Sequence, residues 1–272
     1  MRQFTVTMTI VVLTILVSAP AFSASIGYLV VKEGVMKHRR GNVDKIYRPS
    51  EKKIQLNNRD EVQTGERTRI KIVLLSKRDV LHLYSNSYLK FNQVTPKRSL
   101  LSLPIGKIRC LVRKTLNRIT KRRRNFRLKT VTATIGVKGT DFLVQTNGSS
   151  TNVLTLEGVV SMFSQADITK TIDLAAGMAS RIRGSLPPAP AIEVPVATRQ
   201  EILATDTGET WSGIDFQDGN VDGQKGELID PETRKTLEKI QREIDLLKGN
   251  LGIHEFLNKG KGRNVEVTIP AP

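Results

Sequence analysis

The chain has 272 residues, of which 39% are hydrophobic and 5% aromatic, so it is long enough for one large domain with appendages. Its 43 lysines and arginines exceed its 26 aspartates and glutamates, and the net charge of +17 favours an anionic partner or surface. The three histidines lack metal-ligand spacing, the single cysteine excludes an internal disulfide, and no catalytic motif is visible. We therefore expect a non-enzymatic protein without a cofactor.

The N-terminus predicts a signal peptide over residues 1–23. Arg2 supplies a positive charge, residues 4–17 are uncharged and mainly apolar, and small residues follow up to Ser23. Because this apolar stretch is shorter than the ~18–20 residues that span a bilayer, we expect cleavage, after Ser23 or Ala21. An uncleaved anchor is the alternative. We predict a mature protein in the periplasm, secreted or at the cell surface, with no transmembrane span.

Residues 26–183 alternate apolar and polar side chains between glycine-containing turns, which is typical of half-buried strands. In one such run Ile70, Ile72 and Leu74 share a face, and Asn147-Gly148 is a hairpin signal. Alternation places Cys110 on the same face as Ile108 and Val112, so it is expected to be buried. The pattern predicts a mainly β domain, a roll or sandwich of many short antiparallel strands.

The composition changes after this domain. Residues 184–198 are rich in proline and are interpreted as a linker or a strap along the domain surface. Residues 199–272 form a small C-terminal extension with one amphipathic helix at about 231–248, because Asp230 suits the N-cap and Pro231 the first helical position. The apolar stripe of this helix consists of Leu237, Ile240, Ile244 and Leu247. The stripe is expected to pack on the β domain, or else on a partner helix.

Several phrases within 26–183 follow one another in a specific order. They are LNNRDEVQTG at 56–65, TVTATIGVKGTDF at 130–142, VLTLEGVV at 153–160 and LAAG at 174–177. Together they resemble the FecR domain of bacterial periplasmic signalling proteins. The motif positions are Gly136, Val137, Lys138, Gly139, Thr140, Phe142, Glu157 and Gly158. Glycines at this spacing favour a fold-determining bend, with a ligand site as the weaker interpretation.

The resemblance implies a mainly β fold and a role in binding or signalling. FecR-type proteins best known by function control a sigma factor through a cytoplasmic N-terminal segment. Here only Met1, Arg2 and Gln3 precede the apolar stretch, so we expect no such segment. The expected function is a stand-alone binding or scaffold module of the cell envelope. The alternatives are a periplasmic sensor that assists a membrane regulator or transporter, and a structural protein attached to a surface polymer.

Charge is unevenly distributed along the chain. Residues 80–140 contain no acidic residue but fifteen lysines and arginines. The candidate polyanion-binding residues are Arg113, Lys114, Arg118, Lys121, Arg122, Arg123, Arg124, Arg127 and Lys129. Such a segment fits an envelope protein or an anionic polymer or lipid surface, although a solvated basic face would look the same. Nucleic acid is disfavoured because few aromatic residues interleave the charges. The sequence leaves the oligomeric state open.

A short acidic run, with Asp218, Asn220 and Asp222, matches the first half of a calcium loop. The position that should supply a bidentate glutamate is Ile229. A site without that glutamate would bind calcium weakly, and such runs are common in ordinary turns. We therefore predict no metal site.

Overall fold

The structure is a computed structural model that describes residues 25–74, 79–113, 125–137, 139–205, 214, 216, 231–248 and 264–267. The predicted signal peptide, residues 1–23, lies outside the described residues. Within the described part of the chain, no helix has both the length and the apolar character needed to cross a membrane.

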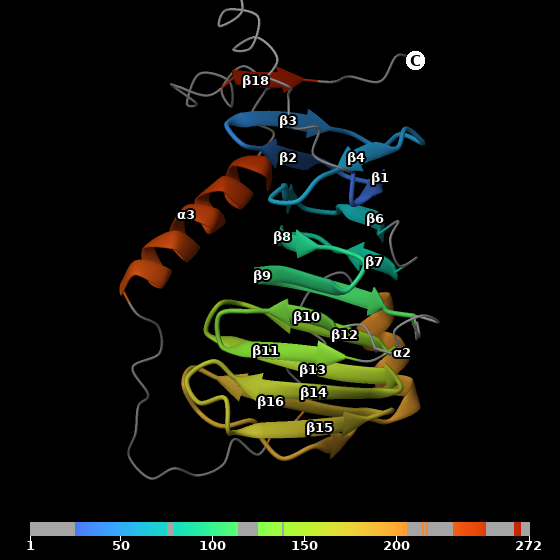
Figure 1. Cartoon of the computed structure of the whole chain (residues 1–272), viewed down its shortest axis with the longest axis vertical. Coiled ribbons are helices and arrows are strands. Elements are labelled where there is room, and N and C mark those ends of the chain that lie inside the picture. Colours follow the sequence, from blue (N-terminus) through green and yellow to red (C-terminus); the bar gives the residue numbers. More distant parts are fainter. Residues whose placement is uncertain are drawn as a thin grey trace, which may run out of the picture.

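The described chain is mainly β, as predicted, and its strands form two connected layers, sheets A and B (Figure 1). From edge to edge, sheet A contains β4 (Ile54–Leu56), β1 (Gly27–Glu33), β6 (Arg69–Leu74), β7 (Asp79–Leu83), part of β9 (Arg98–Leu111), β12 (Asp141–Thr146), β13 (Ser150–Glu157), β16 (Met178–Arg183) and β17 (Ile192–Glu193). Sheet B contains β18 (Asn264–Val267), β3 (Val43–Tyr47), β2 (Met36–Arg40), β5 (Glu61–Thr64), β8 (Tyr88–Val94), the rest of β9, β10 (Asn125–Lys129), β11 (Ala133–Val137), β14 (Val159–Ser164) and β15 (Thr171–Ala175).

Strand pairing is antiparallel in both sheets with two exceptions among the described strands. Strand β10 runs parallel to β9, and β18 runs parallel to β3. The expectation of antiparallel strands is therefore right for most of the fold and wrong at these pairs. Residues 114–124, which precede β10, lie outside the described residues.

Strand β9 belongs to both sheets. Its first part, up to Ile105, pairs with β8 and β10 in sheet B, and its second part, from Gly106, pairs with β7 and β12 in sheet A. The strand changes sheets at Gly106, whose φ is +113°. A Cβ atom there would lie 2.4 Å from the Cα of Ser87, so only glycine fits this bend.

The main core lies between the two sheets. The alternation seen in the sequence directs Ile70, Ile72 and Leu74 into it, and each is fully buried. Phe126 of sheet B meets Phe142 of sheet A edge to face, with ring centroids 6.3 Å apart. Cys110 is buried in this core as expected, and burial raises the pKa of its thiol well above the usual value.

The FecR-like motif lies where the chain crosses between the sheets. Strand β11 of sheet B leads through Gly139 into β12 of sheet A, and β13 returns through Gly158 to β14 of sheet B. Both glycines have a φ of +83°. Gly136 has no positive φ, but a Cβ there would lie 3.5 Å from the ring of Phe163. Lys138 lies outside the described residues.

The proline-rich stretch runs along the edge of sheet A. The Ala189 amide donates to the carbonyl of Arg181 (2.8 Å), the Ser180 hydroxyl donates to the carbonyl of Ala189 (2.6 Å), and β17 then pairs with β16. These contacts make the stretch a strap rather than a free linker.

A helix that the sequence analysis did not predict, α2 (Val196–Ala204), follows the strap. Its Ile202 packs on the outer face of sheet A against Leu143 and Leu154. Because Ile202 is the only residue of α2 that is buried, the helix has no apolar stripe to reveal it.

Candidate functional site

The outer face of sheet B carries the C-terminal helix, α3 (Pro231–Lys248). Ile240 and Ile244 are 7% and 0% exposed and pack against Tyr88 of β8 and Ile105 of β9. The predicted apolar stripe therefore packs on the β domain. Figure 1 shows α3 running obliquely along one side of the sheet, with one end near β2.

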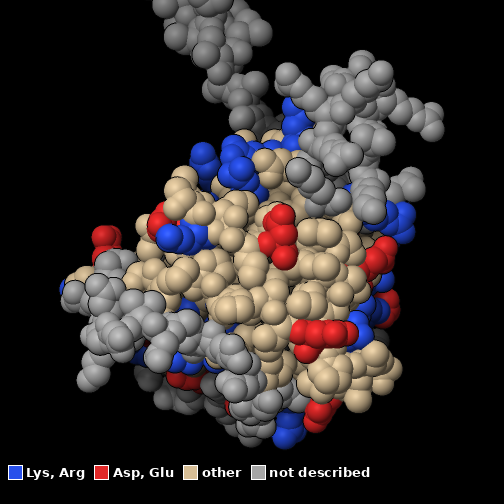
Figure 2. All heavy atoms as spheres, turned by 90° about the horizontal axis from the view of Figure 1, so that it is seen from below, with Lys and Arg blue, Asp and Glu red and all other residues tan. Residues whose placement is uncertain are grey.

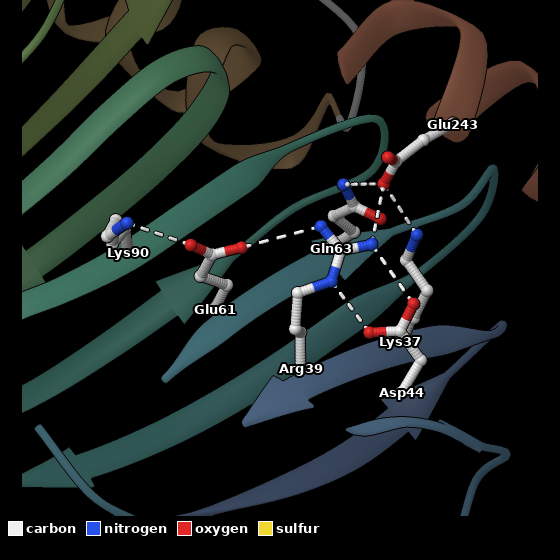
Figure 3. Close-up of polar contacts among 7 residues, drawn as sticks. All are labelled: Lys37, Arg39, Asp44, Glu61, Gln63, Lys90 and Glu243. Carbon is white, nitrogen blue, oxygen red and sulfur yellow. Dashed lines mark hydrogen bonds and ion pairs between the residues drawn. The ribbon is translucent and has the colours of Figure 1, made fainter. Parts of the chain in front are cut away.

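Charged side chains alternate in sign across the neighbouring strands of this face. In register, Asp44 lies opposite Arg39, Arg39 opposite Glu61, and Glu61 opposite Lys90. The Nε of Arg39 is 2.6 Å from Asp44 Oδ1, its Nη1 is 3.6 Å from Glu61 Oε2, and Lys90 Nζ is 2.9 Å from Glu61 Oε1 (Figure 3). We call these residues the charged row. Opposite charges on adjacent strands stabilise the sheet.

Beside the charged row, a carboxylate from α3 receives donors from two strands. Glu243 Oε2 accepts hydrogen bonds from Lys37 Nζ at 2.6 Å, Gln63 Nε2 at 2.8 Å and Arg39 Nη2 at 3.2 Å (Figure 3). Lys37 is 3% exposed and Gln63 is 2% exposed. Donors that converge on one oxygen, two of them charged, form an anion cradle, which we call the Glu243 cradle.

The cradle controls the charge state of its members. Burial alone would raise the pKa of Glu243, but the hydrogen bond and charge of Lys37, with help from Gln63 and Arg39, lower it to about 2. Burial lowers the pKa of Lys37, against the opposing attraction of Glu243. Burial and the neighbouring Glu61 carboxylate both raise the pKa of Tyr88. Docked Glu243 is therefore ionised at neutral pH and loses its charge only as pH falls toward 2.

A second buried ion cluster supports the sheet from inside. Asp60, which is 1% exposed, accepts hydrogen bonds from Arg40 at 2.8 and 2.9 Å and from the Asn57 amide at 2.8 Å, and it lies 2.8 Å from His38 Nε2. Burial opposes ionisation of Asp60, yet the contacts with His38, Arg40 and Asn57 hold its pKa below the usual range. All these partners lie within the fold, so this cluster is structural.

The predicted basic face is only partly within the described residues. Arg127 and Lys129 are exposed on the outer face of β10, close to the exposed Arg98 of β9. Arg113 is exposed just beyond β9, and its amide lies 3.4 Å from Asp79 Oδ1. Lys114, Arg118, Lys121, Arg122, Arg123 and Arg124 lie outside the described residues.

Some lysines and arginines of the acid-free segment are paired with, or buried against, residues outside it. Lys90 pairs with Glu61, and Arg109 pairs with Asp141 at 2.6 Å. Lys107 is 2% exposed and donates to the carbonyl of Ile202 at 2.7 Å and to that of Thr205, at the C-terminal end of α2. Counting charges along the sequence therefore overstates the basic surface.

The basic surface does not extend over the end of the molecule that carries β14 and β15. Figure 2 shows uncharged residues over most of this end, with aspartates and glutamates near its middle and lysines and arginines toward its margins. Ile168 in the β14–β15 turn is 76% exposed there. Among the described residues seen in this view, lysines and arginines therefore lie around the margin of this end.

No group of metal-ligating side chains occurs among the described residues. The weak calcium candidate, Asp218, Asn220 and Asp222, lies outside them.

The sequence analysis missed the Glu243 cradle. Two signals for it were present: Lys37 and Arg39 alternate in β2 and therefore share a face, and Glu243 lies three residues after Ile240, beside the apolar stripe of α3. Neither signal names the partner, because Lys37 and Glu243 are 206 positions apart.

Comparison with known families matches residues 60–161 to the family described as FecR protein. The chain therefore contains a FecR domain over these residues, inside the predicted range 26–183. The match begins at Asp60, the centre of the buried ion cluster, and includes both crossover glycines. No curated protein matches the chain.

Among solved structures, the chain is similar to a "putative anti-sigma factor" from Parabacteroides distasonis ATCC 8503, in crystal structures at 2.50 and 1.65 Å resolution. Both matches have a TM-score of 0.43 and 15% sequence identity and cover 53% of this chain. The chain covers 63% and 64% of those solved chains, which is less than two thirds of their length.

Proposed function

We propose that this protein is an exported, non-enzymatic binding or scaffold module of the bacterial cell envelope. Its partner is an anionic polymer or lipid surface, or an acidic envelope protein. This partner binds to a basic face on sheet B of the protein. The FecR domain over residues 60–161 supports a binding role in the envelope. The sign of the net charge, +17, supports an anionic partner.

One observation carries this proposal. On the outer face of sheet B, the alternation of charge ends beyond Lys90. The next residue across is the uncharged Ser102 of β9, and it separates Lys90 from Lys129 of β10. Within the described part of the chain, no carboxylate forms an ion pair with Arg98, Arg127 or Lys129. These exposed cations therefore keep their full attraction for an external anion, unlike the paired cations of the charged row.

Export is part of the proposal and has its own test. The predicted signal peptide would be removed after Ser23 or Ala21, and the mature chain would begin at Ala24 or Phe22. N-terminal sequencing of the protein from fractionated cells of a diderm host checks this. A cytoplasmic chain that retains Met1 would contradict export.

The basic face is tested by co-sedimentation of the mature protein with phosphatidylglycerol vesicles and with purified lipopolysaccharide over a salt series. Each cation near an anionic surface contributes about 1 kcal/mol, so changing Arg98, Arg127 and Lys129 together to Ser should weaken binding on the order of a hundredfold. Binding should also weaken as salt increases.

The matched control removes the same charge elsewhere by changing the exposed Arg48, Lys52 and Lys170 to Ser. This variant should retain most of its binding. Equal losses in the two variants would show that net charge alone drives binding and would refute a localised basic face. A further variant with Ser at positions 121–124 measures how much these four basic residues, which lie outside the described residues, contribute to binding.

A further inference from the structure

The Glu243 cradle is built by the β domain and is filled by a carboxylate that the C-terminal helix brings to it. Lys37 and Arg39 are held on β2, and Gln63 is held on β5, in register with Lys37. Asp44 fixes the Arg39 guanidinium through a pair of hydrogen bonds of 2.6 and 3.0 Å. The donors are therefore positioned by the sheet itself, not by α3.

Apolar residues lie directly beside these donors. Gln63 is in register with Tyr88, and Tyr88 with Ile105, so one cross-strand line leads from the cationic donor Lys37 to an apolar patch. Helix α3 fits this line with a carboxylate at Glu243 and with Ile240 and Ile244, which lie on the same side of the helix. The surface is thus complementary to one carboxylate and two apolar side chains at helical spacing.

The seat of α3 is separate from the main core. Tyr88, Ile240 and Ile244 form their own small cluster, with Ile105 packed against it. Most other side chains of α3 are exposed or half-buried. Phe216 is 5% exposed and packs in the cluster with Leu143 and Leu154, so the segment between this anchor and α3 is residues 217–230, which can span up to about 50 Å. The helix can therefore leave its seat without removing any residue from the core between the sheets.

We propose that this surface is a docking site for an amphipathic helix of a partner protein, and that α3 is a resident occupant that competes for it. The partner helix presents one Glu or Asp between apolar residues, spaced like Ile240, Glu243 and Ile244. The site is a different surface from the basic face of β10, so neither proposal depends on the other. Such docking belongs to the helix-in-groove mode of recognition.

An imperfection in the seat of α3 supports displacement by a better ligand. Gln63 is 2% exposed, and its Oε1 has no hydrogen-bond partner among the described residues. A buried acceptor without a donor weakens the docked state. A partner helix that places a Ser, Asn or Gln side chain against this oxygen would satisfy it and would bind more tightly than α3.

The shape and charge of the seat favour a helix over a polyanion. The donors converge on one oxygen of a single carboxylate, and the apolar Ile105 follows on the same line. Glu61 lies beside the cradle, 3.6 Å from Arg39, and would repel a second anion of a polymer. A helix with a single acidic side chain avoids both problems, because its apolar residues can contact Ile105 and it brings no second anion near Glu61.

The test uses the full chain and a fluorescent peptide with the sequence of residues 231–248 as the probe. The tethered α3 competes at a high effective concentration, so the wild-type chain should bind the peptide weakly. Changing Ile240 and Ile244 to Ser loosens α3 and leaves the seat intact. The loosened chain should bind the peptide at least tenfold more tightly than the wild-type chain in fluorescence anisotropy.

Two controls define specificity. A peptide that carries Glu243→Lys should not bind the loosened chain, because the cradle would face a cation. Changing Glu238 and Arg242 to Ser alters exposed positions of α3, so this chain should bind the peptide as weakly as the wild type. Failure of the loosened chain to bind the peptide, or equal binding of both peptides, would overturn the proposal.

A disulfide provides an independent test in the closed state. A Cβ on Gly65 would lie 3.3 Å from the Cβ of Leu247, close to the separation found in disulfides, so Gly65→Cys with Leu247→Cys should join α3 to the sheet. Cys110 is fully buried and should not interfere. The oxidised chain should bind no peptide, and reduction should restore the weak binding expected of the wild-type chain. Equal binding before and after reduction would place the peptide elsewhere and refute the docking site.

Discussion

Gly139 and Gly158 face each other where the chain crosses between the sheets: a Cβ on Gly158 would lie 2.9 Å from the carbonyl oxygen of Gly139 and 2.8 Å from Cγ2 of Thr140. The outgoing and returning crossovers therefore pack backbone against backbone. This contact explains physically why position 158 is glycine, since a side chain there would force the crossovers apart, whereas Gly139 is favoured by its φ of +83°.

The crossover contact predicts the effect of adding one methyl group. Gly158→Ala should lower the free energy of unfolding by about 2 kcal/mol or more, because it adds a steric clash to the ~1–2 kcal/mol cost of a positive φ. Gly41→Ala is the matched control, since Gly41 also has a positive φ, +58°, but nothing lies within 4 Å of its Cβ position. Urea unfolding of both variants measures the difference. Equal losses would mean that the contact contributes nothing.

Lys107 predicts how strongly α2 is attached to sheet A. Its ammonium group binds carbonyls at the end of α2 and lies 5.1 Å from the centroid of the Tyr84 ring. Lys107→Met should cost about 2 kcal/mol, because buried acceptors lose a charged donor. Hydrogen exchange of α2 amides should accelerate more than that of β12. Lys97→Met, at an exposed position, should change neither measurement.

The attachment of α3 should depend on pH through Glu243. Its pKa is about 2 when α3 is docked, against an ordinary value of 4.5, so the stabilisation is complete above about pH 4.5 and is lost as pH falls toward 2. Hydrogen-exchange protection of α3, compared with that of β13, should decrease over this range. Glu243→Gln should show weak protection already at pH 6 and a flatter profile. An unchanged profile in that variant would exclude Glu243 as the titrating group.

Asp60 predicts the stability of the FecR domain itself. Asp60→Asn should lower the free energy of unfolding by about 2–3 kcal/mol, because it removes the charged acceptor of the buried His38 and of the partly exposed Arg40 guanidinium. Thermal unfolding followed by circular dichroism measures the loss. The exposed Glu33→Gln should have little effect. A small loss at Asp60 would mean that water replaces the carboxylate at no cost.

Local patterns in the sequence predicted the strands and the C-terminal helix because each pattern reports burial on one face. Ile70, Ile72 and Leu74 alternate and are buried, and Ile240 with Ile244 forms the buried line of α3. Alternation does not state which sheet a strand joins, so the parallel pairing of β9 with β10 could not be predicted. Helix α2 was missed because Ile202 is its only buried residue.

Contacts between distant residues were beyond the reach of sequence patterns. The acid-free segment looked uniformly basic, yet Lys90 and Arg109 meet Glu61 and Asp141 from outside it. The Glu243 cradle joins residues of β2 and α3 in the same way. Pairing of this kind depends on strand register, which is set by the three-dimensional fold. The role of the remaining basic face stays a prediction.

The passage of β9 from one sheet to the other has a mechanical consequence. Because the bend at Gly106 makes one strand a member of both layers, the layers cannot slide past each other without breaking the ladders of β9 with β7, β8, β10 and β12. A force applied to sheet B would reach sheet A through the continuous backbone of β9 as well as through the core. Shear between the two sheets is therefore opposed by the backbone of β9 and its ladders as well as by side-chain packing.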